Sequence, residues 1–224
     1  QEILEDLGSE AFARTHLLLR RDPTRQRFQD DWIIAALERG AGLDFEERYS
    51  CARGERQACG MDLAPSDKLA RCDHNVLCQV MRGPQGWRLL YLEADRDHRW
   101  SARRHADLVS DYHGRYPGTD FACESNYGQR HFVEFVDELT LARIHAVYTG
   151  AERHHPVLGV EGIAVVMERG EWILPSGYGG KDAVRVTLLR RTGEERGFSV
   201  RPEVALLIGE LRSFSPDDRH IPDL

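Results

Sequence analysis

From residue 76 onwards, short apolar segments alternate with glycine-containing turns, and this spacing constrains the fold more than any other feature of the sequence. Three pairs of segments are separated by turns short enough for β-hairpins: Val76–Met81 with Trp87–Glu93, Val165–Glu168 with Trp172–Leu174, and Val184–Arg190 with Phe198–Arg201. Short strands at this spacing, without helices between them, are typical of an antiparallel sheet and not of a doubly wound parallel sheet.

Further strands and two helices complete the expected secondary structure. Strand-like segments also occur at Phe132–Val136, Leu141–Tyr148 and Val204–Phe214. Asp22 and Pro23 begin a predicted helix that ends at Gly40, because Asp is a good N-cap, Pro fits the first turn and Gly commonly follows the last turn. Ser101 is predicted to cap a second helix through Tyr112, with a buried face made of Ala106, Leu108, Val109 and Tyr112.

These elements predict an α+β fold, in which a mainly antiparallel sheet carries a few helices and the helices lie mostly in the N-terminal half. The chain shows no internal repeat and no low-complexity linker, so we expect residues 1–224 to form one domain. If there are two lobes, we expect the boundary at residues 113–118, where His-Gly-Arg-Tyr-Pro-Gly would separate an N-terminal lobe with the helices and the cysteine loop from a C-terminal β lobe.

The composition is that of a globular protein, with 41% hydrophobic and 30% charged residues. No uninterrupted apolar run approaches the roughly 20 residues that a membrane-spanning helix needs. The chain begins at Gln1 and not at Met, so we expect a mature chain from which a signal peptide has been removed. A lipid anchor on a cysteine before Gln1 is an alternative form of the same expectation.

The charge of the chain bears on its partners. The formal net charge is -7 and is spread evenly along the sequence. Nucleic acids and anionic membranes attract basic surfaces, so this balance predicts that the chain does not bind nucleic acid. Nearly all its basic residues are arginines, whose planar guanidinium groups pair with carboxylates and stack on aromatic rings. Such a surface favours contacts with other proteins.

Four of the five cysteines, Cys51, Cys59, Cys72 and Cys78, lie close together in the sequence. Their spacings, C-x7-C and C-x5-C, are wider than the tight knuckles of structural zinc sites, whereas disulfides readily close loops of this size. We therefore expect the disulfides Cys51–Cys59 and Cys72–Cys78, which would place the protein in an oxidising compartment. The alternatives are crossed pairings, free buried thiols, or an irregular zinc site that includes His74.

The fifth cysteine, Cys123, lies in the strand-like segment Thr119-Asp-Phe-Ala-Cys-Glu-Ser. We predict that it is a small buried hydrophobic residue of a strand. A disulfide between Cys123 and one of the other four cysteines is the alternative.

No complete catalytic motif is present. The sequence lacks the G-x-S-x-G nucleophile elbow, the H-E-x-x-H zinc motif and the phosphate-binding P-loop. Asp95, Asp97 and His98 form an acidic cluster, but it lacks the glycine at the turn of a calcium-binding loop. We therefore expect a surface turn there, with no metal and no cofactor.

These observations favour a periplasmic or otherwise extracytoplasmic bacterial protein that is not an enzyme. We expect it to inhibit a secreted toxin or hydrolase by protein–protein contact, as an immunity protein does. The expected contact residues are aromatic and acidic residues of exposed loops: Tyr112, Tyr116, Tyr127, Tyr178, Asp95 and Asp97. The alternative is a metal-assisted hydrolase or a zinc-stabilised module, which would use Asp95, Asp97, His98 or the cysteines with His74.

Overall fold

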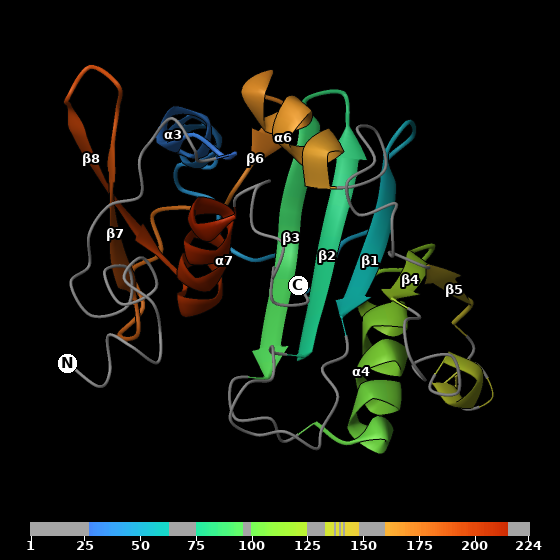
Figure 1. Cartoon of the computed structure of the whole chain (residues 1–224). Helices are drawn as coiled ribbons and strands as arrows, with labels where there is room; N and C mark the ends of the chain where they lie inside the picture. The colour runs from blue at the N-terminus through green and yellow to red at the C-terminus, as the bar shows by residue number, and fades with distance from the viewer. Residues whose placement is uncertain are drawn as a thin grey trace, which may run out of the picture.

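The computed structural model describes residues 27–62, 75–95, 100–124, 133–136, 138, 140, 142–147 and 160–214 (Figure 1). The elements follow one another in the order α3 (Asp30–Arg39), β1 (Arg56–Asp62), β2 (Asn75–Gly83), β3 (Gly86–Asp95), α4 (Ala102–Arg115), β4 (Asp120–Glu124), β5 (Ile144–Val147), α6 (Val160–Glu168), β6 (Trp172–Ile173), β7 (Val184–Leu189), β8 (Glu195–Val200) and α7 (Pro202–Ser213). Helices and strands are thus mixed along the chain.

Six of the strands form one sheet with the order β5-β4-β1-β2-β3-β6. The strands β1, β2 and β3 form an antiparallel meander, in which the predicted β2–β3 hairpin is confirmed. By contrast, β4 is parallel to β1, β5 is parallel to β4, and β6 is parallel to β3. The predicted α+β class is confirmed, although the core sheet is mixed, because α4 provides the crossover that a parallel neighbour of β1 requires.

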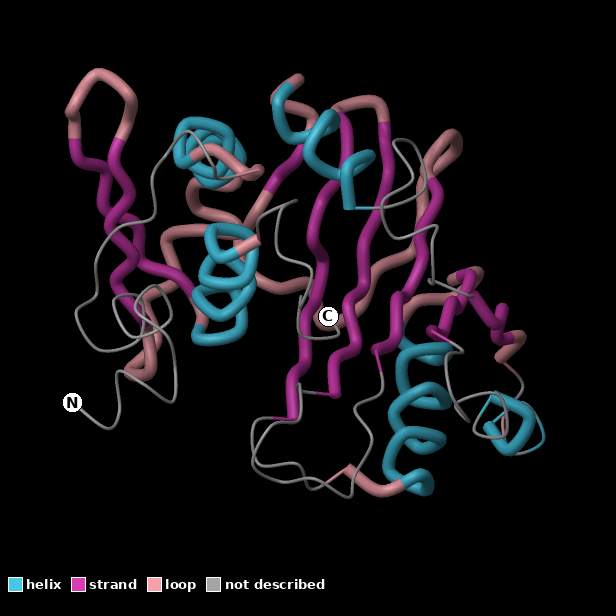
Figure 2. The backbone as a smooth tube through the Cα atoms, viewed as in Figure 1, coloured by secondary structure: helices cyan, strands magenta, loops and turns pink. Residues whose placement is uncertain are grey.

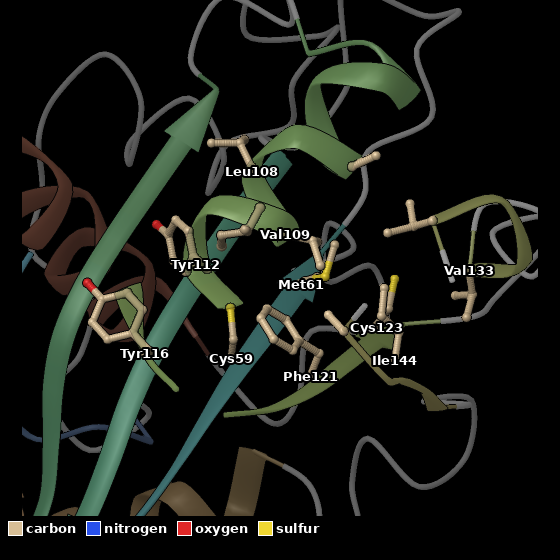
Figure 3. Packing of buried hydrophobic residues seen from close by; sticks show 14 of the residues in the cluster. Cys59, Met61, Leu108, Val109, Tyr112, Tyr116, Phe121, Cys123, Val133 and Ile144 are labelled. Atoms are coloured by element: carbon tan, nitrogen blue, oxygen red, sulfur yellow. The ribbon is translucent and has the colours of Figure 1, made fainter. Parts of the chain in front are cut away.

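Helices pack on both faces of this sheet. On one face, Tyr112 of α4 packs in a cluster with Cys59 of β1 and Phe121 of β4 (Figure 3). On the other face, α3, α6 and α7 share a cluster with Leu89 and Leu92 of β3. Figures 1 and 2 show α6 crossing in front of β2 and β3, whereas β1 lies beside β2 with no described helix in front of it. On this second face, the described helices therefore lie over β2 and β3 and not over β1.

The two predicted helices are present. Ser101 caps α4 as predicted, since its Oγ accepts a hydrogen bond of 3.2 Å from the backbone N–H of Arg104. The helix α3 ends before Gly40, where a Cβ atom would lie only 1.9 Å from the carbonyl oxygen of Leu174. Only glycine fits this close approach. The predicted start of this helix at residues 22–23 lies outside the described residues, and within them the helix begins at Asp30.

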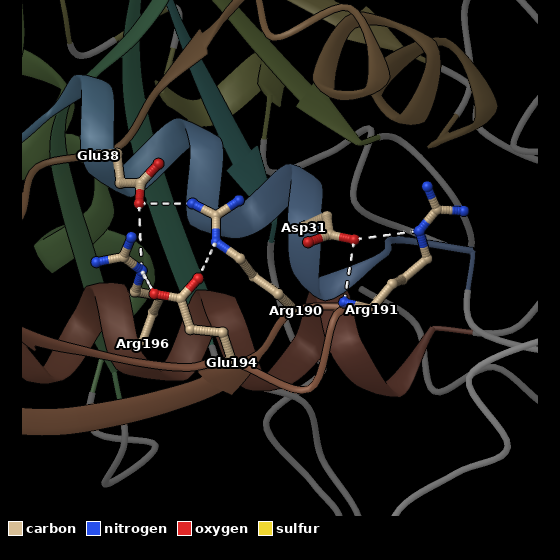
Figure 4. Close-up of polar contacts among 6 residues, drawn as sticks. All are labelled: Asp31, Glu38, Arg190, Arg191, Glu194 and Arg196. Carbon is tan, nitrogen blue, oxygen red and sulfur yellow. Dashed lines mark hydrogen bonds and ion pairs between the residues drawn. The ribbon is translucent and has the colours of Figure 1, made fainter.

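The strands β7 and β8 form the predicted third hairpin, which makes a separate two-stranded sheet. Ion pairs tie this hairpin to α3 (Figure 4). The guanidinium of Arg190 lies 2.7 Å from the carboxylate of Glu38 and 3.7 Å from that of Glu194. At the other end of α3, Arg191 lies 3.3 Å from the carboxylate of Asp31. These pairs are mostly exposed, so they orient the hairpin more than they stabilise the fold.

Three segments predicted as strands are helical instead, wholly or in their described part. Residues 165–168 belong to α6, so the predicted hairpin with Trp172–Leu174 is wrong, and residues 204–213 belong to α7. Short apolar runs do not reveal whether their period is that of a helix or a strand. In α7 the proline at the first helical position, Pro202, is the clearer signal. Residues 133–136 are also helical, so helices lie in both halves of the chain.

No helix in the described ranges is both long enough and apolar enough to span a bilayer. The organisation of residues 1–224 as one domain stays a prediction, as does the alternative boundary at residues 113–118.

Candidate active site

The strands β1 and β4 are parallel neighbours that end together. The last pair in their register is Met61 with Cys123. Each strand has one further residue, which is Asp62 in β1 and Glu124 in β4. Because neighbouring strands lie about 4.8 Å apart, these two acidic positions stand side by side at the carboxyl ends of the strands.

Both positions belong to the face of the sheet opposite α4. Met61 and Cys123 are buried in the cluster that α4 covers. Successive residues of a strand alternate between the two faces, so positions 62 and 124 belong to the opposite face. Asp62 is partly exposed to solvent. The fold therefore places the backbone positions of two acidic residues at one edge of the sheet, where Asp62 is partly exposed.

The sequence of β1 explains why this face is open. The residues of β1 on the α4 face are all buried: Gln57, Cys59 and Met61. The residues on the other face are short or polar: Arg56, Ala58, Gly60 and Asp62. Such side chains bring little apolar surface to bury, and no helix among the described residues covers them. This part of the sheet stays exposed beside the acidic pair.

The acidic pair is suited to a divalent metal ion. Carboxylate oxygens are the ligands that Mg²⁺ and Mn²⁺ prefer. Asp62 and Glu124 therefore fit such an ion. Within the described ranges, no group of three or more His, Cys, Asp or Glu residues is placed to hold a metal, so the pair is the whole candidate site there.

The acidic cluster that the sequence suggested lies elsewhere. Asp95 is buried at the end of β3, where its Oδ2 accepts hydrogen bonds from the Asn75 side chain (3.2 Å) and the Trp100 backbone N–H (2.6 Å). Asp95 thus holds the segment before α4 in place through hydrogen bonds, and it is not an exposed residue that a protein partner could contact. Asp97, His98 and His74 lie outside the described residues.

Two other titratable groups lie near the first turns of α4. Burial raises the pKa of the Glu93 carboxyl group, although the guanidinium of Arg104, 3.6 Å away, opposes this shift. Burial lowers the pKa of His105, whose Nδ1 lies 2.9 Å from the carbonyl oxygen of Ser101. Both belong to the α4 face, so neither is near the acidic pair.

The tyrosines predicted as partner contacts are mostly buried. Tyr112 and Tyr116 are fully buried, and Figure 3 shows both between α4 and the sheet. The hydroxyl of Tyr116 donates a 2.6 Å hydrogen bond to the backbone carbonyl of Glu46. Tyr178 is partly exposed, and its ring lies 4.2 Å from the guanidinium carbon of Arg201. Tyr127 lies outside the described residues.

The predicted disulfides are contradicted. Cys51, Cys59 and Cys78 are free thiols, so the pair Cys51–Cys59 is wrong and Cys78 is not bridged to Cys72, which lies outside the described residues. Cys59 and Cys78 belong to the strands β1 and β2, where burial raises the pKa of each thiol, to about 12 for Cys78. Cys123 is a buried residue of the strand β4, as predicted. Most of these thiols are core residues.

Sequence reasoning missed both Asp62 and Glu124. The segment that contains β1 was interpreted as a cysteine-stapled loop, because Ala58 and Gly60 are poor strand formers and hide the alternation. One local signal was available, namely the alternation of Gln57, Cys59 and Met61 that ends at an acid. The pairing of residues 62 and 124 has no local signal, since it depends on a parallel register across a crossover.

Solved structures with this fold are nuclease domains of viral terminases. The manganese-soaked, inhibitor-bound terminase nuclease domain of human cytomegalovirus is 14% identical, with a TM-score of 0.51 over 88% of this chain and 90% of that chain. The magnesium-bound large terminase nuclease of the thermophilic phage G20c is 10% identical, with a TM-score of 0.50 over 86% of this chain and 98% of that chain. The sequence matches no protein-family model, and no curated protein matches it in sequence.

These comparisons correct the functional interpretation of the sequence. The neighbours are nucleases, which contradicts a non-enzymatic immunity protein that binds no nucleic acid. They are also phage and viral proteins, and the described cysteines are free thiols, so the periplasmic or otherwise extracytoplasmic location is contradicted as well. What the likeness shows, at this level of identity, is that the chain has the fold of terminase nuclease domains.

Proposed function

We propose that this chain is a metal-dependent nuclease that hydrolyses phosphodiester bonds of DNA at the carboxyl ends of β1 and β4. The observation that carries the proposal is the side-by-side placement of Asp62 and Glu124 on an open face of the sheet. The fold supports it, because similar structures are terminase nucleases, one with bound magnesium and one soaked with manganese.

The roles of the two carboxylates follow from their position. Asp62 and Glu124 would hold a divalent ion, which when bound lowers the pKa of water and offsets negative charge on a phosphate. The neighbouring strands fix the spacing of the two residues, because each is tied to its neighbour by backbone hydrogen bonds. The strand backbone that carries the two acids is thus already ordered before the substrate arrives, and preorganisation of this kind is a major source of catalysis.

The test is a cleavage assay on plasmid DNA with Mg²⁺ or Mn²⁺, comparing the wild type with Asp62→Asn and Glu124→Gln. Each substitution keeps the size of the side chain and removes its charge. We expect each variant to lose at least about 100-fold in cleavage rate, because a metal-holding charge is removed, and to remain folded in a thermal unfolding measurement. Chelation of the metal should abolish wild-type cleavage.

Glu168→Gln is the matched control, because Glu168 is an exposed acid at the end of α6 on a different part of the surface. It should cleave at the wild-type rate. Two results would show that this acidic pair is not the active site. One is that the wild-type protein binds Mn²⁺ weakly or not at all. The other is that the Asp62→Asn variant cleaves DNA at the wild-type rate.

A further inference from the structure

Within the described residues, the face of β1 that leads to Asp62 is exposed or partly exposed at every position. Arg56 and Gly60 are exposed and Ala58 is partly exposed, although their neighbours in the sequence are buried. A Cβ atom added to Gly60 would meet no described atom within 4 Å. The helix α6 lies over β2 and β3, and no described helix lies in front of β1 (Figure 1). A second molecule can therefore approach the backbone of β1 closely.

Two arginines stand at the far end of this open face. Arg56 of β1 pairs directly with Arg82 of β2, and both are exposed. Like charges placed opposite each other on neighbouring strands are destabilising. Within the described residues neither arginine forms an ion pair, although the guanidinium carbon of Arg82 lies 5.4 Å from the centre of the Trp87 ring. This arrangement leaves two positive charges available to an anionic partner.

The spacing between the arginines and the acids suits a nucleic-acid strand. Arg56 lies six residues before Asp62 in one strand, which corresponds to roughly 20 Å at about 3.3 Å per residue. With a rise of about 3.4 Å per nucleotide, this length corresponds to roughly six nucleotides. A strand with one phosphodiester bond at Asp62 would therefore bring other phosphates to the arginines.

We propose that one strand of the DNA substrate lies along the open face of β1, with its phosphates bound by Arg56 and Arg82 and its scissile phosphate at Asp62. This inference rests on the proposed function and adds to it the path of the DNA strand across the sheet. The small residues Ala58 and Gly60 make room for the strand. One charge opposes binding, because Asp120 is exposed on the same face beside Ala58.

The first part of the test removes the phosphate contacts. Arg56→Gln and Arg82→Gln are compared with wild type for binding to a fluorescein-labelled DNA duplex of about 20 base pairs, in Ca²⁺ and over a range of salt concentrations. Each variant should weaken binding several-fold and reduce the slope of log Kd against log salt by about 0.9. In cleavage assays KM should rise while kcat changes little.

The second part of the test uses substitutions that either obstruct the proposed DNA path along β1 or remove a negative charge from it. Gly60→Val should fold at least as stably as wild type, because the added side chain enters open space and valine suits a strand. It should nevertheless weaken DNA binding, since the valine would stand where the DNA strand lies. Asp120→Asn should have the opposite effect and tighten binding. Arg103→Gln is the matched control, because Arg103 is an exposed arginine of α4 whose ion pair among the described residues is with Asp107, on the same helix.

The outcomes separate this inference from the proposed function. If wild type cleaves DNA and the β1 variants shift binding as stated, both are supported. If wild type cleaves but Gly60→Val and the arginine variants bind like wild type and like Arg103→Gln, the path along β1 is wrong and the proposed function stands. If wild type binds with the stated shifts but never cleaves, the binding face is supported and the nuclease is not. No binding at all would overturn both.

Discussion

The two faces of β1 differ in almost every physical respect, although they alternate residue by residue along seven positions. The face towards α4 carries Cys59 and Met61, which are buried with Phe121 of β4. The other face carries Gly60 and Asp62, which no described helix covers. The packed face holds the strands in register, and the open face presents the acids that this register brings together. Stability and proposed chemistry are thus divided between the two sides of one strand.

This difference explains how the backbone of the candidate site can be held rigidly although the site faces solvent. A binding residue on a loop depends on the loop for its position, whereas Asp62 is fixed by strand pairing on both sides of β1. The open face of β1 buries little apolar surface, so the hydrophobic cluster on the other face stabilises the strand. The following predictions test this division of roles, in order of decreasing effect.

The largest expected effect is on the packed face of β4. Phe121→Ala should destabilise the protein by about 3–5 kcal/mol, because Phe121 is fully buried and its loss leaves a cavity beneath α4. Ala122→Ser, one residue further on the open face, should change the free energy of unfolding by less than about 0.5 kcal/mol. Urea denaturation measures both. If both substitutions changed the free energy of unfolding equally, the two faces would not differ in packing as stated.

A smaller effect is expected from pH, again on the packed face. Burial holds the pKa of His105 below its ordinary value of 6.5. The folded state therefore binds fewer protons than the unfolded state, so the stability present above pH 6.5 is lost as the pH falls through that value. The urea midpoint of wild type should drop over this range. His105→Gln should flatten the profile whatever its effect at neutral pH, with His145→Gln, an exposed histidine of β5, as the control. An unchanged profile in His105→Gln would assign the acid sensitivity to other groups.

The smallest expected effect is a gain on the open face. Gly60→Ala should stabilise the protein by about 0.5–1 kcal/mol, because glycine in a strand costs conformational entropy and the new methyl group meets no described atom. The urea midpoint should rise accordingly. A loss of stability would instead mean that this face is closely packed in solution, which would also weaken the proposed path of the substrate.

Much of the local structure could be predicted from the sequence, because its signals are short-range. Ser101 and the apolar face of α4 identify that helix, and the turns between β2 and β3 and between β7 and β8 identify two hairpins. The helices at residues 160–168 and 202–213 could not be separated from strands, since short apolar runs fit both periods. In the cysteine segment, spacing alone favoured disulfides, whereas in the tertiary structure Cys59 is a buried strand residue and Cys78 a partly buried one.

What the sequence determined by itself is therefore the globular composition of the chain and those local elements, such as α4 and two hairpins, that have short-range signals. What only the tertiary structure decided is the candidate site. Asp62 and Glu124 lie at the ends of two strands joined through β2, β3 and α4, and a parallel register brings them side by side. No local preference encodes that register. It is selected by the burial of Cys59, Met61 and Phe121 beneath α4, which fixes the face and the alignment on which the two acids stand.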